Sequence, residues 1–539
     1  MPQKAQAIRF SAAGLSDALD STEVFPGAMQ SLQNLIVDPT TVNMWYCRPG
    51  AVQLTAFAGF NTPGFISALE VIGNYAYGMI ASQRFPGFDE PFMFNLQTQT
   101  FVTISGVTSG NVPTSPPTTG DWTPPQVAIC STYVLITHPG YTGANGYFCQ
   151  INIANLATPV YASTNTATTA LVCPPTAVAA FSGRAWYACN PPSGAQPGLY
   201  FSDVLFPLTI TNATNILTFD DNIPLTCLTG LPLSNQLGGV IQALIVFKGT
   251  TNIYQITGDA ASTSNPLAKN SLNYATGTLA ANSVCQTPVG VAFLAPDGYR
   301  LIDFNAKISE PMGFAGSGVN APFIFCLHPS RVQGSCNNNI IRISIQNGTT
   351  TGQPFQEYWF DMARKVWSGP HTCAASMISP WGNSFVMAPV SQTGVLWQSD
   401  VVQSATSQFT EGGVNLTWLW ETCTLPDNGI EAMACLLETQ FLMSYGSPAQ
   451  QFVMNATDQD DNVYASYSFT GGSSASQWGS MIWGVSTWGG VSLNPVYVDI
   501  NWPIPIVFRR LELAMGGTSV GGLRLGALFG RVKALGYIT

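Results

Sequence analysis

The sequence predicts an all-β chain with a β-propeller core of six or seven blades and an additional β-sandwich-like domain at its carboxyl end. Three observations lead to this prediction. Two distant segments share one strand-turn-strand template, strand-like clusters recur at the spacing of propeller blades, and charged residues make up only 9% of the chain. An average globular domain has about 25% charged residues. Because long amphipathic helices need charged faces, this composition argues against a helical fold.

The shared template occurs at residues 94–101 and 360–367. In each copy an aromatic-rich strand ends at Asn95 or Asp361, a polar run follows, and Phe101 or Trp367 leads into the next strand. An Asn or Asp side chain at such a position hydrogen-bonds the backbone of a turn. The template therefore predicts the outer hairpin of a propeller blade.

The elements follow in a simple order along the chain. Residues 1–60 have turn signals and few strands, so we expect an N-terminal docking segment. We expect the propeller at 61–404, because strand clusters recur there about every 40 to 55 residues. Residues 405–539 contain longer alternating strands, which predicts a separate sandwich-like domain. The strand clusters of the propeller cover residues 66–104, 127–160, 177–219, 240–258, 283–308, 340–367 and 374–399.

The charge pattern excludes several classes of protein. The net charge of −10 is spread thinly, and no basic stripe is available to hold phosphates, so we expect no sequence-specific binding of nucleic acid. No apolar run is long enough to cross a bilayer, and the first ten residues lack the apolar core of a secretion signal. We therefore expect no membrane insertion and synthesis in a cytoplasm.

The chain has twelve cysteines and three histidines. The cysteines are scattered, so we expect mostly buried free thiols, which behave as small hydrophobes. Cys326 and His328 would share one face of a strand, as would His371 and Cys373, and the four could bind zinc if the two strands were neighbours. Buried thiols and turn histidines are the commoner outcome. Whether the four side chains meet stays open at this stage, and no metal or cofactor is expected.

Three tryptophans, Trp478, Trp483 and Trp488, lie five residues apart between glycines. This spacing matches neither a strand nor a helix, so we expect a glycine-hinged loop. Large aromatic side chains on such a loop are candidates for a subunit interface. They could instead stack on sugars.

The sequence has no Gly-Lys-Ser/Thr of a phosphate-binding loop and no His-Glu-x-x-His of a zinc protease. A carboxylate pair of a glycosidase needs only convergence in space. Asp220, Asp221 and Asp303 therefore leave a sugar-cleaving site open, although we expect the protein not to be an enzyme.

Short motifs give the chain a resemblance to a known family. Near the start they are Gly14-Leu15, Gly27-Ala28-Met29, Leu32, Asn34-Leu35 and Arg48-Pro49-Gly50, and further along they occupy 199–203, 243–248, 253–259 and 298–302. With these loose motifs, residues 1–400 resemble the tail nozzle, or tail tubular protein B-like, subunits of short-tailed bacteriophages.

The resemblance implies a structural virion protein of the phage tail that is synthesised in the bacterial host cytoplasm. Such a subunit forms a homo-oligomeric ring, expected to be a hexamer, through which DNA is ejected into the host without specific binding. Its partners would be the head-tail adaptor protein and the tail fibre, tail spike or needle proteins, and no catalytic residue is carried over. The alternative is a carbohydrate-binding or glycan-cleaving β-propeller that recognises a host receptor.

Overall fold

The computed structural model of the chain is all-β. No helix among the residues it describes combines the length and apolar character that crossing a membrane requires. The described residues are 6–10, 14–16, 28–38, 44–56, 65–117, 121–163, 171–192, 195–219, 221–234, 240–260, 262–273, 275–312, 319–346, 355–390, 394–402, 409–422, 432–444, 450–457, 462–471, 496–500, 502, 506–508, 510–518 and 524–537.

Seven antiparallel sheets follow one another along the chain, each built from consecutive strands. The first three contain β6 (Ile66–Ile72), β7 (Tyr75–Ala81), β8 (Asp89–Asn95) and β9 (Thr100–Val102); β10 (Val127–Cys130), β11 (Tyr133–Ile136), β12 (Cys149–Asn152) and β13 (Val160–Ala162); and β14 (Ala177–Phe181), β15 (Arg184–Cys189), β16 (Gly198–Phe201) and β17 (Ile216–Thr218). The other four contain β18 (Leu225–Ser234), β19 (Val240–Lys248), β20 (Asn252–Thr257) and β21 (Ala268–Asn273); β22 (Cys285–Thr287), β23 (Gly290–Ala295) and β24 (Gly298–Asp303); β25 (Gln333–Asn337), β26 (Ile340–Gln346), β27 (Phe355–Asp361) and β28 (Val366–His371); and β29 (Ala375–Trp381), β30 (Ser384–Pro389) and β31 (Val395–Asp400).

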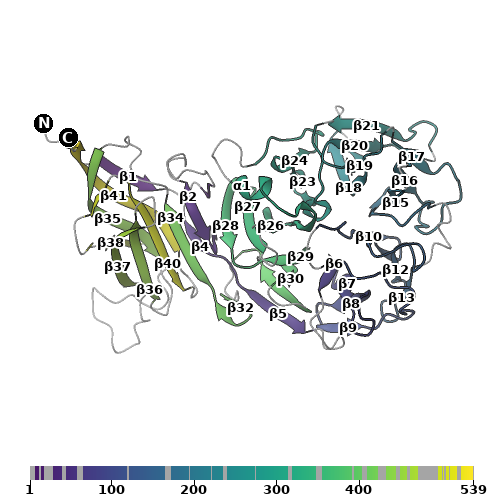
Figure 1. The fold of residues 1–539 in the computed structure, drawn as a ribbon, viewed down its shortest axis with the longest axis horizontal. Coiled ribbons are helices and arrows are strands. Elements are labelled where there is room, and N and C mark those ends of the chain that lie inside the picture. The colour runs from purple at the N-terminus through teal and green to yellow at the C-terminus, as the bar shows by residue number, and fades with distance from the viewer. Residues whose placement is uncertain are drawn as a thin grey trace.

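These sheets are arranged in a closed, propeller-like ring. The first strands lie around a common centre, since β6 contacts β10, β10 contacts β14, β14 contacts β18, β22 contacts β25, β25 contacts β29, and β29 returns to β6. Between the fourth and fifth sheets, β18 contacts β23. Strands β15, β23 and β30 are buried along their whole length, because neighbouring sheets cover both of their faces. Figure 1 shows the ring in the right half of the molecule.

The two copies of the sequence template form equivalent hairpins, as predicted. Each joins the third and fourth strands of its sheet, with Phe94 opposite Phe101 and Phe360 opposite Trp367. The Asn95 Oδ1 atom accepts the N–H of Gln97 at 3.0 Å, and the Asp361 Oδ1 atom accepts the N–H of Arg364 at 3.0 Å. Gln99 and Lys365, at the same template position, both have positive φ, +52° and +58°. The aromatic pairs have ring centroids 5.1 and 4.8 Å apart.

A strand from the start of the chain completes the last sheet of the ring. Strand β5 (Ala51–Ala56) pairs antiparallel with β31, and Leu54 is buried in the same apolar cluster as Leu396 and Ile66. The short strands β32 (Thr410–Glu411) and β33 (Val414–Asn415) extend this sheet beyond β5. Segments more than 300 residues apart in sequence therefore close the ring together.

The remaining strands form two further sheets. One has the order β3 (Leu35–Val37), β4 (Trp45–Cys47), β41 (Arg524–Tyr537), β35 (Ala432–Ser444) and β38 (Val496–Ile500), with β1 (Gln6–Phe10) on β41 and β39 (Ile506–Phe508) on β35. The other has the order β2 (Met29–Gln33), β34 (Thr417–Thr422), β40 (Glu512–Thr518), β36 (Gln450–Thr457) and β37 (Val463–Gly471). Side chains of both sheets pack together, for example Trp420 and Phe441 with ring centroids 5.5 Å apart.

The same apolar cluster continues from these two sheets into the ring. It includes Trp420 and Phe441 between the sheets, and also Trp367, Phe323 and Tyr358 of the sixth sheet region. The helical segments described here are short: α1 (Ala321–Ile324), η2 (Ala281–Ser283) and η4 (Pro329–Arg331). The two parts of the molecule therefore share a core.

The sheets divide the chain differently from the predicted boundaries. Residues 1–60 were expected to form a docking segment of their own, but β1 to β4 pair within the sheets of the C-terminal strands, and β5 pairs within the ring. In Figure 1 the purple strands β1, β2 and β4 lie among the yellow-green C-terminal strands. The reason is that free sheet edges are covered by whichever strand reaches them, regardless of position along the chain.

Candidate functional site

The centre of the ring encloses a cavity of about 440 Å³. All seven sheets contribute to its wall, mainly through their first strands, and polar and sulfur-bearing side chains in the wall include Glu70, Gln126, Cys227, Asn282, Gln286 and Met377. A volume of this size matches the pockets that hold small molecules. The cavity is therefore a candidate small-molecule site to which all seven sheets contribute.

Glu70 is the charged residue of this wall. It is half-buried in β6, between the apolar residues Leu69 and Val71. Burial raises its pKa to about 7, and a hydrogen bond from the Ser379 hydroxyl offsets part of that rise. The same hydroxyl accepts the N–H of Val71 at 2.9 Å, which fixes its position beside the carboxyl.

The other polar groups of the wall are held by the protein. Gln126 Nε2 lies 2.7 Å from Cys227 Sγ, and Gln286 Nε2 donates to the carbonyl oxygen of Gly230 at 3.1 Å. Burial raises the pKa of the Cys227 and Cys285 thiols to about 12 each. These thiols stay protonated at neutral pH, which makes them poor nucleophiles and poor metal ligands.

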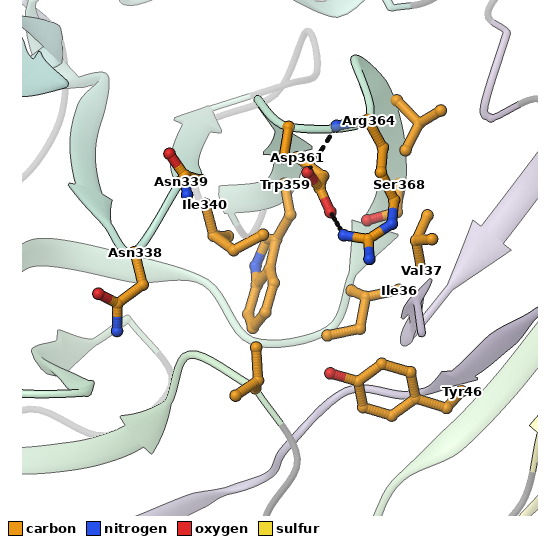
Figure 2. A pocket seen from close by; sticks show the side chains of 13 residues that line it. Ile36, Val37, Tyr46, Asn338, Asn339, Ile340, Trp359, Asp361, Arg364 and Ser368 are labelled. Carbon is orange, nitrogen blue, oxygen red and sulfur yellow. Dashed lines mark hydrogen bonds and ion pairs between the residues drawn. The ribbon is translucent and has the colours of Figure 1, made fainter. Parts of the chain in front are cut away.

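A second, smaller cavity lies where the ring meets the N-terminal strands. Its volume is about 210 Å³, and Figure 2 shows Ile36 and Tyr46 on one side and Trp359, Asp361 and Arg364 on the other. The Arg364 Nη1 atom lies 2.8 Å from Asp361 Oδ2, so the guanidinium is held by the turn of the repeated hairpin. The pocket is therefore a crevice of the joint between the two parts of the molecule.

Buried polar contacts hold this joint together. The guanidinium of Arg48 is fully buried, donates to Asn34 Oδ1 at 2.9 Å and pairs with Glu411. Asn34 has a positive φ of +57°, and its N–H donates to His371 Nδ1 at 3.0 Å. Burial, followed by the nearby Arg48 and Arg342, lowers the pKa of His371. A neutral imidazole can accept this hydrogen bond, so the geometry and the charge agree.

Ser67, Asp89 and His138 meet in the core of the ring, and these residue types also form hydrolase triads. His138 Nε2 lies 3.1 Å from Asp89 Oδ2 and 3.4 Å from Ser67 Oγ, while the N–H of Gly140 donates to His138 Nδ1 at 3.0 Å. A triad needs the serine and the carboxylate on opposite ring nitrogens. Here both face Nε2 and all three residues are buried, so the cluster is arranged as a structural one.

The residues singled out as a possible zinc site do not come together. His328 lies 3.5 Å from Asp121, whereas His371 lies 3.2 Å from Ser368 Oγ. Cys326 packs against the shared core, and Cys373 is buried in a different apolar cluster. Within the described ranges, no three His, Cys, Asp or Glu side chains are grouped as metal ligands. All the cysteines that the structure describes are free.

The other predicted site residues have different outcomes. Trp478, Trp483, Trp488 and Asp220 lie outside the described residues. Asp221 pairs with Lys248, and Asp303 accepts the N–H groups of Asn305 and Lys307 in its own turn. These two carboxylates are therefore engaged in local structure.

Sequence reasoning did not single out Glu70, Arg48 or Glu411 as site residues. For Glu70 a signal was present, since a lone carboxylate inside the apolar strand 66–72 is unusual and charged residues are rarely buried without a partner. For Arg48 and Glu411 no local signal exists, because 363 positions separate them in sequence.

No protein-family model and no curated protein sequence matches the chain. Among solved structures it is similar to a puromycin-hydrolysing peptidase of Mycobacterium tuberculosis, with a TM-score of 0.38 and 8% identity over 70% of this chain and 60% of that one. It is also similar to the β-propeller domain of the Trilobed protease from Pyrococcus furiosus (TM-score 0.32, 6% identity, 64% and 97% covered) and to the Dos1 propeller (TM-score 0.32, 11% identity, 69% and 91% covered). No activity follows for this chain from these similarities.

Proposed function

We propose that the chain is a structural subunit of the tail nozzle of a short-tailed bacteriophage. Identical copies, six in the expected ring, surround the path of the ejected DNA, and the head-tail adaptor and the tail fibre, spike or needle proteins are their neighbours. In this proposal the seven sheets and β5 are the blades of a seven-bladed propeller, and the two remaining sheets are a β-sandwich. The subunit works without catalysis and without a cofactor.

The observation that supports this proposal best is the joint between the two parts of the molecule. Several of the motifs that carry the family resemblance lie there: the N–H of Leu15 donates to the carbonyl oxygen of Trp367 at 3.0 Å, Asn34 bonds His371, and Arg48 pairs with Glu411. Gly14 has φ +104°, and a Cβ there would lie 3.3 Å from Val366. The shared core and the buried polar contacts fix the relative position of the two parts of the molecule, which suits a structural subunit.

The size of the central cavity favours a conduit formed between subunits. A space of about 440 Å³ inside the ring of sheets accommodates a small molecule. It is far too small for a DNA duplex, so DNA would pass outside the individual propeller. Only a closed ring of subunits, built from one repeated head-to-tail interface, supplies a wider opening.

The charge of the chain fits a conduit that does not hold DNA. Each Lys or Arg that contacts a phosphate adds affinity and salt dependence. With 28 acidic and 18 basic residues, we expect a neutral to acidic lumen. Measurable duplex binding at physiological salt that weakens steeply with added salt would contradict this expectation.

The turn between β16 and β17 offers an apolar surface for a second copy of the chain. Leu205 and Phe206 are 63% and 65% exposed, and Leu205 has φ +63°. Asp203 stabilises the turn, because its Oδ2 atom accepts the N–H of Thr211 at 3.3 Å. Rigidly presented, exposed apolar side chains are typical of interface anchors, and the tryptophans of residues 478–488 remain a second candidate.

The decisive test is to image the protein alone, mixed with its adaptor, and in virions. Closed rings in the sample with the adaptor, and labelled antibody at the tail tip of virions, are the expected results, whereas the protein alone is monomeric where the subunit contact needs the adaptor as a template. Native mass spectrometry gives the copy number. Single copies or peripheral trimers in virions, together with retention of the purified protein on a glycan array, would contradict the nozzle proposal. Host-receptor recognition would then be the favoured function.

A further inference from the structure

The central cavity of the ring presents hydrogen-bond acceptors more than donors. The amide nitrogens of Gln126, Asn282 and Gln286 point to protein acceptors: Cys227 Sγ at 2.7 Å, Met377 Sδ at 3.9 Å and the carbonyl oxygen of Gly230 at 3.1 Å. Within the described part of the chain, the Oε1 atom of Gln126 has no hydrogen-bond partner. That oxygen is itself buried in the wall, so among the described residues the amide acceptors left for an occupant are the side-chain oxygens of Asn282 and Gln286, which both line the cavity.

Glu70 is the one carboxylate among the residues that form the wall. Across the described residues, no Lys, Arg or His forms an ion pair with Glu70. Its protein partner is the hydroxyl of Ser379, which is itself fixed by the N–H of Val71. Removing a carboxylate from water without a cation is costly, so a cation entering the cavity would gain a strong interaction.

We propose that the central cavity binds a small organic cation bearing a guanidinium or primary ammonium group, with Glu70 as its counter-charge and the amide oxygens of the wall as further acceptors. The N–H donors of such a cation match the unpaired acceptors, and its alkyl part fits the apolar wall formed by Val127, Val178 and Leu228. Charge-assisted hydrogen bonds to a carboxylate are the strong ones in such a setting.

Other ligand classes fit this wall less well. An anion would meet Glu70 and no cationic side chain of the wall. A metal ion would need a cluster of ligands, and no group of three or more His, Cys, Asp or Glu side chains with that arrangement occurs in the described ranges. The thiols of Cys227 and Cys285 also stay protonated at neutral pH.

The test uses the full chain and methylguanidinium chloride as the probe, measured by calorimetric titration and ligand-observed NMR at pH 8. Tetramethylammonium has the same charge without N–H donors, and sodium chloride matches the ionic strength. Glu70→Gln removes the charge and keeps the shape. Glu90→Gln is the matched control, because Glu90 is buried in the same sheet, accepts a hydrogen bond from Ser82 Oγ at 2.9 Å and is not part of the cavity wall.

We expect the wild-type chain and Glu90→Gln to bind methylguanidinium equally, and Glu70→Gln to bind it at least about tenfold more weakly. Tetramethylammonium should compete poorly. Absence of binding to the wild-type chain, or equal binding by Glu70→Gln, overturns the proposal. If Glu70→Gln does not fold, Gln286→Leu is tested in its place, because the exposed Gln286 side chain supplies one amide oxygen as an acceptor. Unchanged affinity of Gln286→Leu for methylguanidinium also counts against the proposal. These results do not depend on whether the subunits assemble into a ring, so they are distinguishable from a failure of the nozzle proposal.

Discussion

Arg48 and Glu411 form a buried ion pair between the start of the chain and the segment that leaves the ring of sheets. The Arg48 side chain is 0% exposed and that of Glu411 is 13% exposed. Arg48 also donates to Asn34 and to the carbonyl oxygen of Pro49, at 2.9 and 3.0 Å. The guanidinium is thus satisfied by partners from both parts of the molecule, which makes it a point where their relative position is fixed.

Replacing Arg48 by Met should destabilise the protein by about 3–5 kcal/mol, because Glu411 would keep a poorly solvated charge without its partner. Chemical unfolding followed by tryptophan fluorescence measures the loss. The control is Arg364→Met. The Arg364 side chain, which pairs with Asp361, is 37% exposed, so this substitution should cost at most about 1 kcal/mol of stability. Adding Glu411→Leu to Arg48→Met should recover part of the loss, and equal effects of the two arginine variants would contradict this account.

Glu70 should make the stability of the protein depend on pH. Its pKa rises from 4.5 to about 7 on folding, so the unfolded chain loses this proton at lower pH than the native state does. Relative to Glu70→Gln, the wild-type chain should therefore become less stable between pH 4.5 and 7, with a constant deficit above that range. The thiols of Cys227 and Cys285 do not titrate there. The measurement is the difference in Tm between the two chains from pH 4 to pH 8, and a difference independent of pH would refute the assignment.

Leu54→Ala should weaken the closure of the ring. Leu54 is 8% exposed and packs in the cluster that also contains Leu396 of β31, so its truncation should cost about 2–5 kcal/mol. Hydrogen exchange of the amides in β5 and β31 should accelerate before that of the other sheets. Val52→Ala is the matched control on the same strand, because Val52 is 44% exposed and its loss should stay within about 0.5 kcal/mol.

Changing Leu205 and Phe206 to Ser should impair assembly of the proposed ring of subunits. The Tm of the isolated subunit should stay within a few degrees of the wild-type value. Both side chains are exposed, so little core packing is lost, while an interface would lose its apolar anchors. Val414→Ser serves as the control, since Val414 is 71% exposed on β33 at another place on the molecule. Rings that form normally with the double variant would move the subunit contact elsewhere without removing the nozzle proposal.

Changing Trp478, Trp483 and Trp488 to Ala tests the interface prediction made from their spacing. We expect the monomer to melt within a few degrees of the wild-type chain and its assembly to weaken, because aromatic residues on a glycine-hinged loop supply contact area without belonging to a core. Differential scanning calorimetry and particle images are the two readouts. Collapse of the monomer fold would show that these side chains are core residues.

Local features of the sequence determined much of the secondary structure. The turn-forming Asn95 and Asp361 and the aromatic residues around them define two hairpins in the same way at two places, because a turn depends on neighbouring backbone groups only. Scattered cysteines in strand contexts were likewise enough to predict free thiols, and the structure confirms this for the cysteines it describes.

Tertiary structure alone decided which strands pair and which side chains surround the central cavity. Strand β5 lies in a segment where few strands were expected, and pairing with the edge of β31 makes it the closing strand of the ring of sheets. Glu70 could be recognised as a carboxylate in an apolar strand, but the convergence of seven sheets places it in the wall of a cavity where no described cationic side chain pairs with it. Hydrophobic periodicity is a property of a few consecutive residues, whereas pairing and burial depend on edges and surfaces supplied by segments hundreds of residues away.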